Sequence, residues 1–274
     1  MKLKTADIDG IRMRWLEQGE GFPVVLIHGI PTGPRLWRQV MPRLENARAL
    51  AWEMVGYAGS IPAGEGRDIS VGRQADYLVA WLRHLGVERA VLVGHDLGGG
   101  VAQIVAVRHP GLVAGLLLTN SIGYDSWPIP AVKAVRAAGG FAKHLPNAVF
   151  KPSLRAFLGL GHDNGAIASD SFEIHFQPYA EHGGAAAFIR QVRALNVQDT
   201  LAVEDKLPRL NLPARVVWGA ADGFQKVHYG ERFARDLGAR LERIEGGKHF
   251  TPEDHPDIIA RALNDLLREV AVSL

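Results

Sequence analysis

Cysteine is absent from this chain of 274 residues. Its absence excludes disulfide bonds, thiolate metal sites and a cysteine nucleophile. A strong excess of charge is also lacking, because the formal net charge is +2 and no dense run of basic residues occurs. We therefore expect neither nucleic acid nor an anionic membrane as a partner.

Long apolar runs are missing as well. No uninterrupted apolar segment reaches the roughly 18–20 residues that span a bilayer. Residues 1–7 also lack the apolar segment that is typical of a secretion signal. Together these absences predict a soluble cytoplasmic protein that does not use a membrane.

Strand and helix patterns alternate over most of the chain. Helical patterns occur at residues 74–85, 97–106, 229–237 and 256–270. Short apolar or alternating runs predict strands at residues 11–16, 23–27, 48–52, 90–93, 113–118, 214–218 and 240–244. The first of these strands is expected at an edge of the sheet. This order predicts an α/β protein with a mostly parallel sheet and right-handed crossovers.

One stretch interrupts the alternation. Residues 125–205 are rich in Ala, Gly, His and Pro, contain no strand of the buried type and show several short helical patterns. The clearest of these patterns covers residues 185–195. We interpret the stretch as a helical cap inserted into one core domain, which is formed by residues 1–124 and 206–274.

A glycine-rich turn joins one predicted strand to the helix that follows it. Residues 94–99 are Gly-His-Asp-Leu-Gly-Gly, and the strand-turn-helix context is that of a nucleophile elbow, G-x-S-x-G, with Asp96 in the place of serine. Three glycines allow the tight turn and the close approach of the helix. Asp96 could instead be an N-cap for the helix that begins at Leu97.

Two further polar residues follow predicted strands. Asp222 comes after strand 214–218, and His249 comes after strand 240–244. Catalytic groups of parallel sheets gather at the carboxyl ends of the strands, so both can approach Asp96. In the alternative interpretation, Asp222 belongs to a turn with Gly223 and His249 is a surface residue.

Three sequence blocks carry a resemblance to a known family. Residues 28–32 are His-Gly-Ile-Pro-Thr, followed by Leu-Trp-Arg at 36–38. The second block is the elbow, and the third pairs Trp-Gly-Ala-Ala-Asp at 218–222 with Gly-Lys-His-Phe at 247–250. The chain resembles α/β-hydrolases, within them the aspartate-nucleophile branch of haloalkane dehalogenases and epoxide hydrolases. The resemblance implies an α/β-hydrolase core with an inserted helical cap.

The chemistry of these residues points to a two-step hydrolysis. An ionised Asp96 can attack an sp3 carbon and form an aspartyl ester without the help of a base. His249 would then activate water, and Asp222 would fix its tautomer and stabilise the imidazolium. The resemblance places the oxyanion hole at the backbone N–H groups of Ile30 and Leu97. The resemblance makes Asn120 an alternative position for the acid, as in some relatives, but asparagine could not neutralise His249.

The donor for a departing halide is difficult to identify. The resemblance implies a tryptophan directly after the nucleophile, and an asparagine after His-Gly or a second tryptophan from the cap. This chain has Leu97 and Ile30 at the first two positions, and neither side chain can donate a hydrogen bond. Trp127 could supply one indole N–H, although it could equally be an apolar hinge residue.

An epoxide needs an acid that protonates its oxygen. The resemblance implies two tyrosines in the cap, and the candidates are Tyr179 and Tyr124, with His175 as a further one. The tyrosines could equally be packing residues. We expect His28 and His95 to be structural residues beneath the site.

The sequence thus predicts a hydrolase that needs no metal or other cofactor. Its substrate should be small and hydrophobic, and the protein should be a monomer or a homodimer. Two alternatives stay open: an esterase or lactonase that hydrolyses acyl groups, and a ligand-binding protein without catalysis on the same scaffold.

Overall fold

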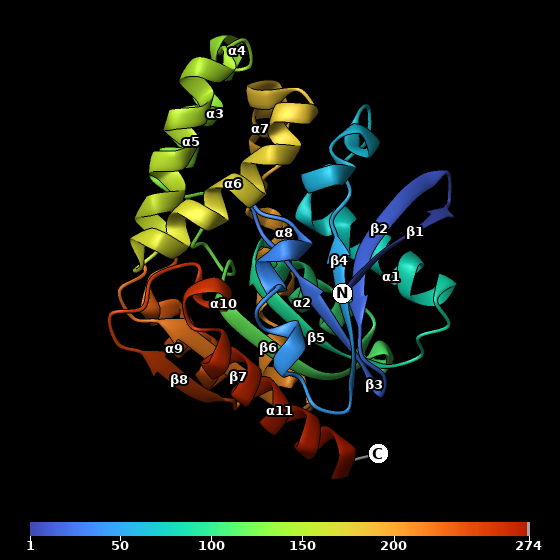
Figure 1. Ribbon diagram of the computed structural model, residues 1–274. Coiled ribbons are helices and arrows are strands. Elements are labelled where there is room, and N and C mark those ends of the chain that lie inside the picture. The colour runs from blue at the N-terminus through green and yellow to red at the C-terminus, as the bar shows by residue number, and fades with distance from the viewer. Residues whose placement is uncertain (273–274) are drawn as a thin grey trace.

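One mixed sheet runs through the protein (Figure 1). The computed structural model describes residues 1–272, apart from the side chains of Phe141 and Ala142. The strands are β1 (Lys2–Ile8), β2 (Ile11–Gln18), β3 (Phe22–Ile27), β4 (Ala47–Glu53), β5 (Ala90–Asp96), β6 (Val113–Ser121), β7 (Ala214–Gly219) and β8 (Arg240–Ile244). They pair in the order β1-β2-β4-β3-β5-β6-β7-β8, and the pairs from β4 to β8 are parallel. The predicted α/β class with a mostly parallel sheet is therefore confirmed.

Helices connect the strands and fill the interruption. They are α1 (Val71–His84), α2 (Leu97–Arg108), α3 (Pro130–Ala137), α4 (Gly139–Ala142), α5 (Asn147–Gly161), α6 (Gly165–Glu181), α7 (Gly184–Arg193), α8 (Gln198–Glu204), α9 (Val227–Asp236), α10 (Thr251–Asp254) and α11 (Pro256–Val272). Among residues 1–272, no helix has both the length and the apolar character that crossing a membrane requires.

The prediction that strand 11–16 lies at a sheet edge was wrong. This strand is β2, and β1 covers its outer side in an antiparallel pairing that runs from Lys2 opposite Glu17 to Ile8 opposite Ile11. Asp9 and Gly10 form the turn with φ angles of 50° and 74°, which two-residue hairpin turns require and Asp-Gly favours. Most β1 side chains are exposed, so its hydrophobic pattern is weak.

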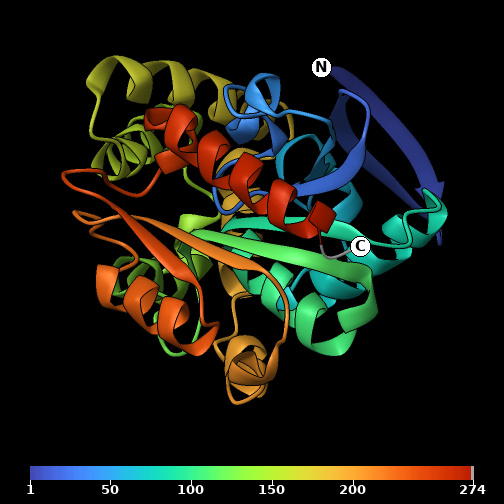
Figure 2. The ribbon, with the colours of Figure 1, turned by 90° about the horizontal axis from the view of Figure 1, so that it is seen from below.

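Helices cover both faces of the sheet (Figure 2). α11 packs against β6 and β7 on one face, while α2 packs on β5 and β6 and α9 packs on β7 from the other. The buried side chains of β3 alternate between these faces, with Leu26 on the α11 side and Ile27 on the α2 side. A strand buried on both faces is apolar at every position, which is why β3 is a continuous apolar run.

The chain between β6 and β7 is helical throughout its regular elements, from α3 to α8. Figure 1 shows α3 to α7 gathered on one side of the sheet as a separate layer. α8 packs instead against α1 and α2 of the core. We retain residues 125–205 as a proposed cap, with α8 as the part that attaches it to the core.

Candidate active site

Asp96 lies on a sharp turn between β5 and α2. Its backbone has φ 50° and ψ −121°, and its side chain makes no capping hydrogen bond to α2. A Cβ atom on Gly98 would lie 2.2 Å from the carbonyl oxygen of Ile27, and one on Gly94 would lie 2.4 Å from Cα of Gly99. Because only glycine fits at these positions, the geometry is that of a nucleophile elbow and not of a helix cap.

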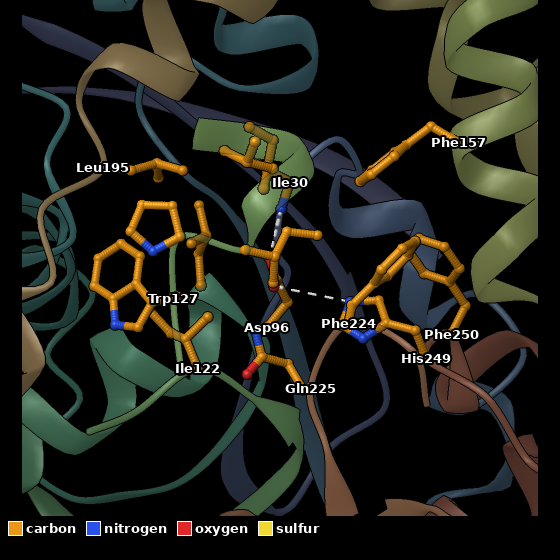
Figure 3. A pocket seen from close by; sticks show the side chains of 14 residues that line it. Ile30, Asp96, Ile122, Trp127, Phe157, Leu195, Phe224, Gln225, His249 and Phe250 are labelled. Atoms are coloured by element: carbon orange, nitrogen blue, oxygen red, sulfur yellow. Dashed lines mark hydrogen bonds and ion pairs between the residues drawn. The ribbon is translucent and has the colours of Figure 1, made fainter. Parts of the chain in front are cut away.

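The two carboxylate oxygens of Asp96 face different partners. Oδ1 accepts a hydrogen bond from the Ile30 N–H at 3.0 Å, and the nearby Leu97 N–H favours the charged carboxylate by lowering its pKa. Oδ2 lies 3.8 Å from His249 Nε2 (Figure 3). A Cβ atom on Gly29 would lie 2.2 Å from Oδ1, so glycine is needed for this approach as well. The structure thus brings the predicted oxyanion-hole positions and the predicted nucleophile together.

His249 is oriented by Asp222. The distance from His249 Nδ1 to Asp222 Oδ2 is 2.8 Å, and both side chains are buried. In the neutral ring, Nδ1–H donates to the carboxylate, so Nε2 keeps its lone pair on the side of Asp96. The other oxygen, Asp222 Oδ1, accepts the Phe224 N–H at 2.6 Å. This is the Asp-His-Asp arrangement that the strand-end positions predict.

Asn120 hydrogen-bonds to Asp222, the predicted acid, and not to the side chain of His249. Its Nδ2 donates to Asp222 Oδ2 at 2.6 Å. Its Oδ1 accepts the Gly219 N–H at 3.1 Å and the Thr251 hydroxyl at 3.0 Å. Asn120 therefore fixes Asp222 through a buried network.

Burial and charge act in opposite directions on the pKa values of the site. Burial raises the pKa of the Asp96 carboxyl above its ordinary value, although the charge of His249 and the N–H groups of Ile30 and Leu97 oppose this rise. Burial lowers the pKa of His249, but the charge and hydrogen bond of Asp222 and the charge of Asp96 outweigh it, and the net pKa is raised. The charge on Asp96 therefore favours a protonated His249.

A model of the alpha/beta hydrolase fold family matches residues 23–256. The chain belongs to this family. A solved alpha/beta hydrolase fold protein from Burkholderia ambifaria is similar over 96% of this chain and 97% of that chain, with a TM-score of 0.88 and 26% identity. The residues matched by the family model include Asp96, Asp222 and His249, and the predicted α/β-hydrolase fold is confirmed.

Curated relatives of this α/β-hydrolase carry several hydrolase names. A 2-hydroxymuconate semialdehyde hydrolase of Pseudomonas putida is 29% identical, with 95% of this chain and 92% of the relative covered. A haloalkane dehalogenase of Mycolicibacterium paratuberculosis is 27% identical (96% and 90% covered). A soluble epoxide hydrolase of a Corynebacterium species is 26% identical (93% and 93% covered). The predicted resemblance to dehalogenases and epoxide hydrolases is confirmed.

A small cavity lies above the Asp96 carboxylate of this hydrolase. Its volume is about 40 Å³, and Figure 3 shows the side chains around it. Most of the lining is apolar and comes from both the core and the helices between β6 and β7, including Ile30, Ile122, Val132, Phe157, Leu195 and Phe250. Since one water needs about 10–15 Å³ by this measure, the cavity holds only a small reacting group.

The structure does not leave Trp127 free as a donor. Its ring lines the cavity, but its indole N–H donates to the Thr200 hydroxyl at 2.7 Å. Thr200 in turn donates to the carbonyl oxygen of Tyr124. Trp127 is therefore a wall residue that ties α8 to the start of the insertion, and it does not offer its N–H to a leaving group.

The two candidate tyrosines, unlike Trp127, do not line the cavity. The Tyr124 hydroxyl donates to Asp236 Oδ2 at 2.8 Å on α9, and its ring lies under the guanidinium of Arg232. The Tyr179 hydroxyl donates to Gln191 Oε1 at 2.6 Å, within the helical insertion. Both hydroxyls are engaged elsewhere, so neither is placed to protonate an epoxide oxygen.

His175 is directed to a buried ion-pair cluster. Its Nε2 lies 3.2 Å from Glu253 Oε1, and Arg38 and Ser171 bind the same carboxylate. This cluster joins α6 of the insertion to α10 of the core. His175 therefore connects the two layers and is not a residue of the cavity wall.

His28 and His95 hydrogen-bond to backbone groups, as expected for structural residues. His28 Nδ1–H donates to the Gly29 carbonyl and its Nε2 accepts the Met54 N–H. Burial lowers the pKa of His28 to about 3 and holds the pKa of His95 well below its usual value. Both rings therefore stay neutral at physiological pH.

The backbone of His249 is held from two sides. His95 Nε2–H donates to its carbonyl oxygen at 3.0 Å. The N–H groups of His249 and Phe250 both donate to the carbonyl oxygen of Gly161, at 2.9 and 3.0 Å. Gly161 is the last residue of α5, so a helix of the insertion contacts the loop that carries the base.

Gln225 is the site residue that the sequence does not reveal. Its buried side chain lines the cavity, and its Oε1 has no hydrogen-bond partner among the described residues. In Figure 3 its amide lies beside Asp96, with the nitrogen turned toward that residue. The only signal was its position on the loop three residues after Asp222. Among the described residues that line the cavity, Gln225 is the one polar side chain besides Asp96, His249 and the indole of Trp127.

Proposed function

We propose that this hydrolase attacks an sp3 carbon of a small hydrophobic substrate with Asp96 and passes through a covalent alkyl-enzyme ester. The proposal rests on the different partners of the two Asp96 carboxylate oxygens. Oδ1 is bonded to the Ile30 N–H, whereas Oδ2 faces His249 at 3.8 Å. A carboxylate held in this way can attack through Oδ2 without losing a proton to a base.

In the first step, a lone pair of Asp96 Oδ2 forms a bond to carbon. The bond from carbon to the leaving group breaks, and the leaving group takes the electron pair. Oδ1 becomes the carbonyl oxygen of the ester and keeps its bond to the Ile30 N–H. No proton has to move when the leaving group departs as a weakly basic anion.

The second step releases the product as an alcohol. Ester formation removes the charge on Asp96, which is one of the causes that raise the pKa of His249. A neutral His249 then takes a proton from water, and hydroxide adds to Asp96 Cγ. The N–H groups of Ile30 and Leu97 stabilise the oxyanion on Oδ1. When the tetrahedral intermediate collapses, the alkoxide leaves with the proton from His249, and Asp96 keeps the oxygen of water. The carboxylic acid formed in this way loses its proton to solvent, which restores the Asp96 carboxylate.

Gln225 is the proposed donor for the leaving group. The groups of Trp127, Tyr124 and Tyr179 that could donate are engaged elsewhere. An amide N–H stabilises an anion but does not give up its proton, whereas an epoxide oxygen needs one. We therefore favour a halide or a similarly weak base over an epoxide oxygen. Halide release from short haloalkanes without diol formation from epoxides is the expected result, and the reverse would overturn this choice.

The test of the covalent step uses His249→Phe, in which the ester should accumulate. After incubation with haloalkanes and epoxides, the peptide that contains Asp96 should gain the mass of the alkyl group. Asp96→Asn is the control and should gain nothing. If the wild-type enzyme consumes a substrate that leaves no adduct in His249→Phe, the covalent mechanism is wrong.

Labelled water gives a second measurement on the unmodified enzyme. Because Asp96 keeps the oxygen of water in each turnover, several turnovers in H₂¹⁸O should place ¹⁸O in the Asp96 peptide. Direct attack of water on the substrate would place the label in the product alone.

Acyl hydrolysis is the second candidate function. Its support is that a relative at 29% identity, named 2-hydroxymuconate semialdehyde hydrolase, is a hydrolase named neither for haloalkanes nor for epoxides. In this case His249 would direct water onto an acyl carbon, the wild-type enzyme would cleave esters or lactones, and Asp96 would remain unlabelled. A protein that only binds ligands would show no turnover of any of these substrates.

A further inference from the structure

A second and larger cavity adjoins the one above Asp96. Its volume is about 340 Å³, and it lies between α3, α5 and α7 of the insertion. Val132 and Phe157 line both cavities, so the two adjoin at these side chains, which we call the neck. The smaller cavity is thus an inner end with the catalytic groups, and the larger one is an outer chamber.

The chamber is built from apolar side chains. Among the residues that the structure describes, Phe150, Phe157 and Phe188 line it together with Leu154 and Ile189. Its one hydroxyl, that of Ser153, already donates to the carbonyl oxygen of Val149 at 2.9 Å. No charged side chain lines it within the part of the chain that the structure describes, so the chamber offers apolar contact without polar recognition.

The neck is connected to the catalytic loop. Phe157 stacks on Phe224, with ring centroids 4.9 Å apart and an interplanar angle of 15°. Phe224 in turn lies edge-on to His249 at 5.2 Å and donates its N–H to Asp222. Figure 3 shows Phe157 and Phe224 on the His249 side of the cavity. A chain that passes the neck therefore arrives next to the base and the nucleophile.

The two volumes suggest how a substrate divides between the cavities. About 40 Å³ above Asp96 accommodates only the reacting carbon and its leaving group. About 340 Å³ in the chamber falls in the range of ordinary ligand pockets. We propose that the chamber binds a straight alkyl chain of the substrate, which reaches Asp96 through the neck of Val132 and Phe157. The place of the reacting carbon rests on the proposed function, but the binding of the chain does not.

The binding test uses 1-alkanols from butanol to decanol, which resemble the substrate chain but carry no leaving group. Dissociation constants of the wild-type protein are measured by calorimetry. Each added methylene that enters the chamber should tighten binding about fourfold, the factor that corresponds to about 0.8 kcal/mol. Affinity that does not change with chain length would overturn the proposal.

Two variants fill the chamber, and a matched variant does not. Ala131 in the first turn of α3 and Ala138 directly after its end line the chamber, whereas Ala137 does not, and all three are exposed. Ala131→Phe and Ala138→Phe should weaken decanol binding at least about tenfold and leave butanol binding unchanged. Ala137→Phe should behave as the wild type, and thermal melting checks that all three fold. Equal decanol affinities in the three variants would place the chain elsewhere.

The adduct experiment separates the two proposals. Chain-length dependence without any adduct on Asp96 would support the chamber and refute the alkyl-enzyme ester. An adduct that forms with equal efficiency from short and long haloalkanes, in wild-type and chamber-filled backgrounds carrying His249→Phe, would support the ester and refute the chamber.

Discussion

Gly29 has no side chain, and Oδ1 of Asp96 occupies space that a Cβ atom would need, 2.2 Å away. Gly29→Ala should therefore push the carboxylate away from the Ile30 N–H. Loss of one oxyanion donor typically lowers kcat by about 10²–10³-fold, and we expect a decrease of this order. Steady-state kinetics with the substrate found by the halide screen measure it. A kcat close to that of the wild type would show that the Ile30 contact is not used.

Asn120 is expected to control the pH dependence through Asp222. Asn120→Asp removes the donor to Asp222 Oδ2 and adds a negative charge beside the His249 pair. A nearby negative charge raises the pKa of a histidine, so the neutral base would form only at higher pH. The rising limb of the kcat profile should move to higher pH, with a lower maximum.

Asn264→Asp is the matched control for this prediction. Asn264 is buried on α11 and bonds to backbone groups of Glu45 and Arg43, away from the site. Asn264→Asp should leave the rising limb of the kcat profile at the same pH as in the wild-type enzyme. An unchanged limb in Asn120→Asp would argue against His249 as the base.

Single residues also show how far the sequence could predict this site. Asp96, Asp222 and His249 could be placed because each follows a strand, and strand ends can be recognised from local patterns. Trp127 could not be judged in this way, because its N–H partner is Thr200, far along the chain. Hydrogen-bond partners across the fold decide which donors are free, and a local pattern does not contain them. The catalytic roles themselves stay predictions until they are measured.

Among the contacts between elements, the contact of α6 with α10 depends on the buried carboxylate of Glu253. Burial raises the pKa of Glu253, but His175, Arg38 and Ser171 overcome this effect and lower the pKa to about 2, against an ordinary value of 4.5. Because the pKa of Glu253 is lower in the folded than in the unfolded protein, the ionised carboxylate stabilises the folded state fully above about pH 4.5. This stabilisation is lost as the pH falls from there toward 2.

We expect Glu253→Gln to lower the free energy of unfolding at neutral pH by up to about 3 kcal/mol, the equivalent of this pKa shift. The variant should also lose that part of the acid sensitivity which the wild type shows between pH 4.5 and 2. Urea unfolding at a series of pH values measures both effects. Glu20→Gln, at an exposed position, is the control and should match the wild type. Parallel curves for wild type and Glu253→Gln would contradict the prediction.

The hairpin of β1 and β2 shows the limit of element prediction. Helices and buried strands could be predicted because burial leaves a periodic apolar pattern. β1 is mostly exposed and carries no such pattern. Its one signal was the pair Asp9-Gly10, which favours a tight hairpin turn. A sheet edge can therefore only be assigned once every turn signal next to it has been considered.

For the whole molecule, stability and catalysis draw on different parts of the structure. Leu263 is fully buried on α11, in the core cluster on that face of the sheet. Leu263→Ala should lower the free energy of unfolding by about 2–5 kcal/mol, because it leaves a cavity. Where the variant is still folded, its kcat should equal that of the wild type, in contrast to Gly29→Ala. A large loss of kcat in folded Leu263→Ala would show that the core face and the site are coupled.

The carbonyl oxygen of Gly161 connects α5 to the loop that carries His249. This helix carries Phe157 at the neck, and its last carbonyl accepts the N–H groups of His249 and Phe250. A substrate wide enough to push α5 outward would therefore also displace the base. Such a substrate could still alkylate Asp96, but its ester would be hydrolysed slowly. We expect oversized substrates to give a burst of leaving group followed by near arrest, so that the enzyme treats them as covalent inhibitors.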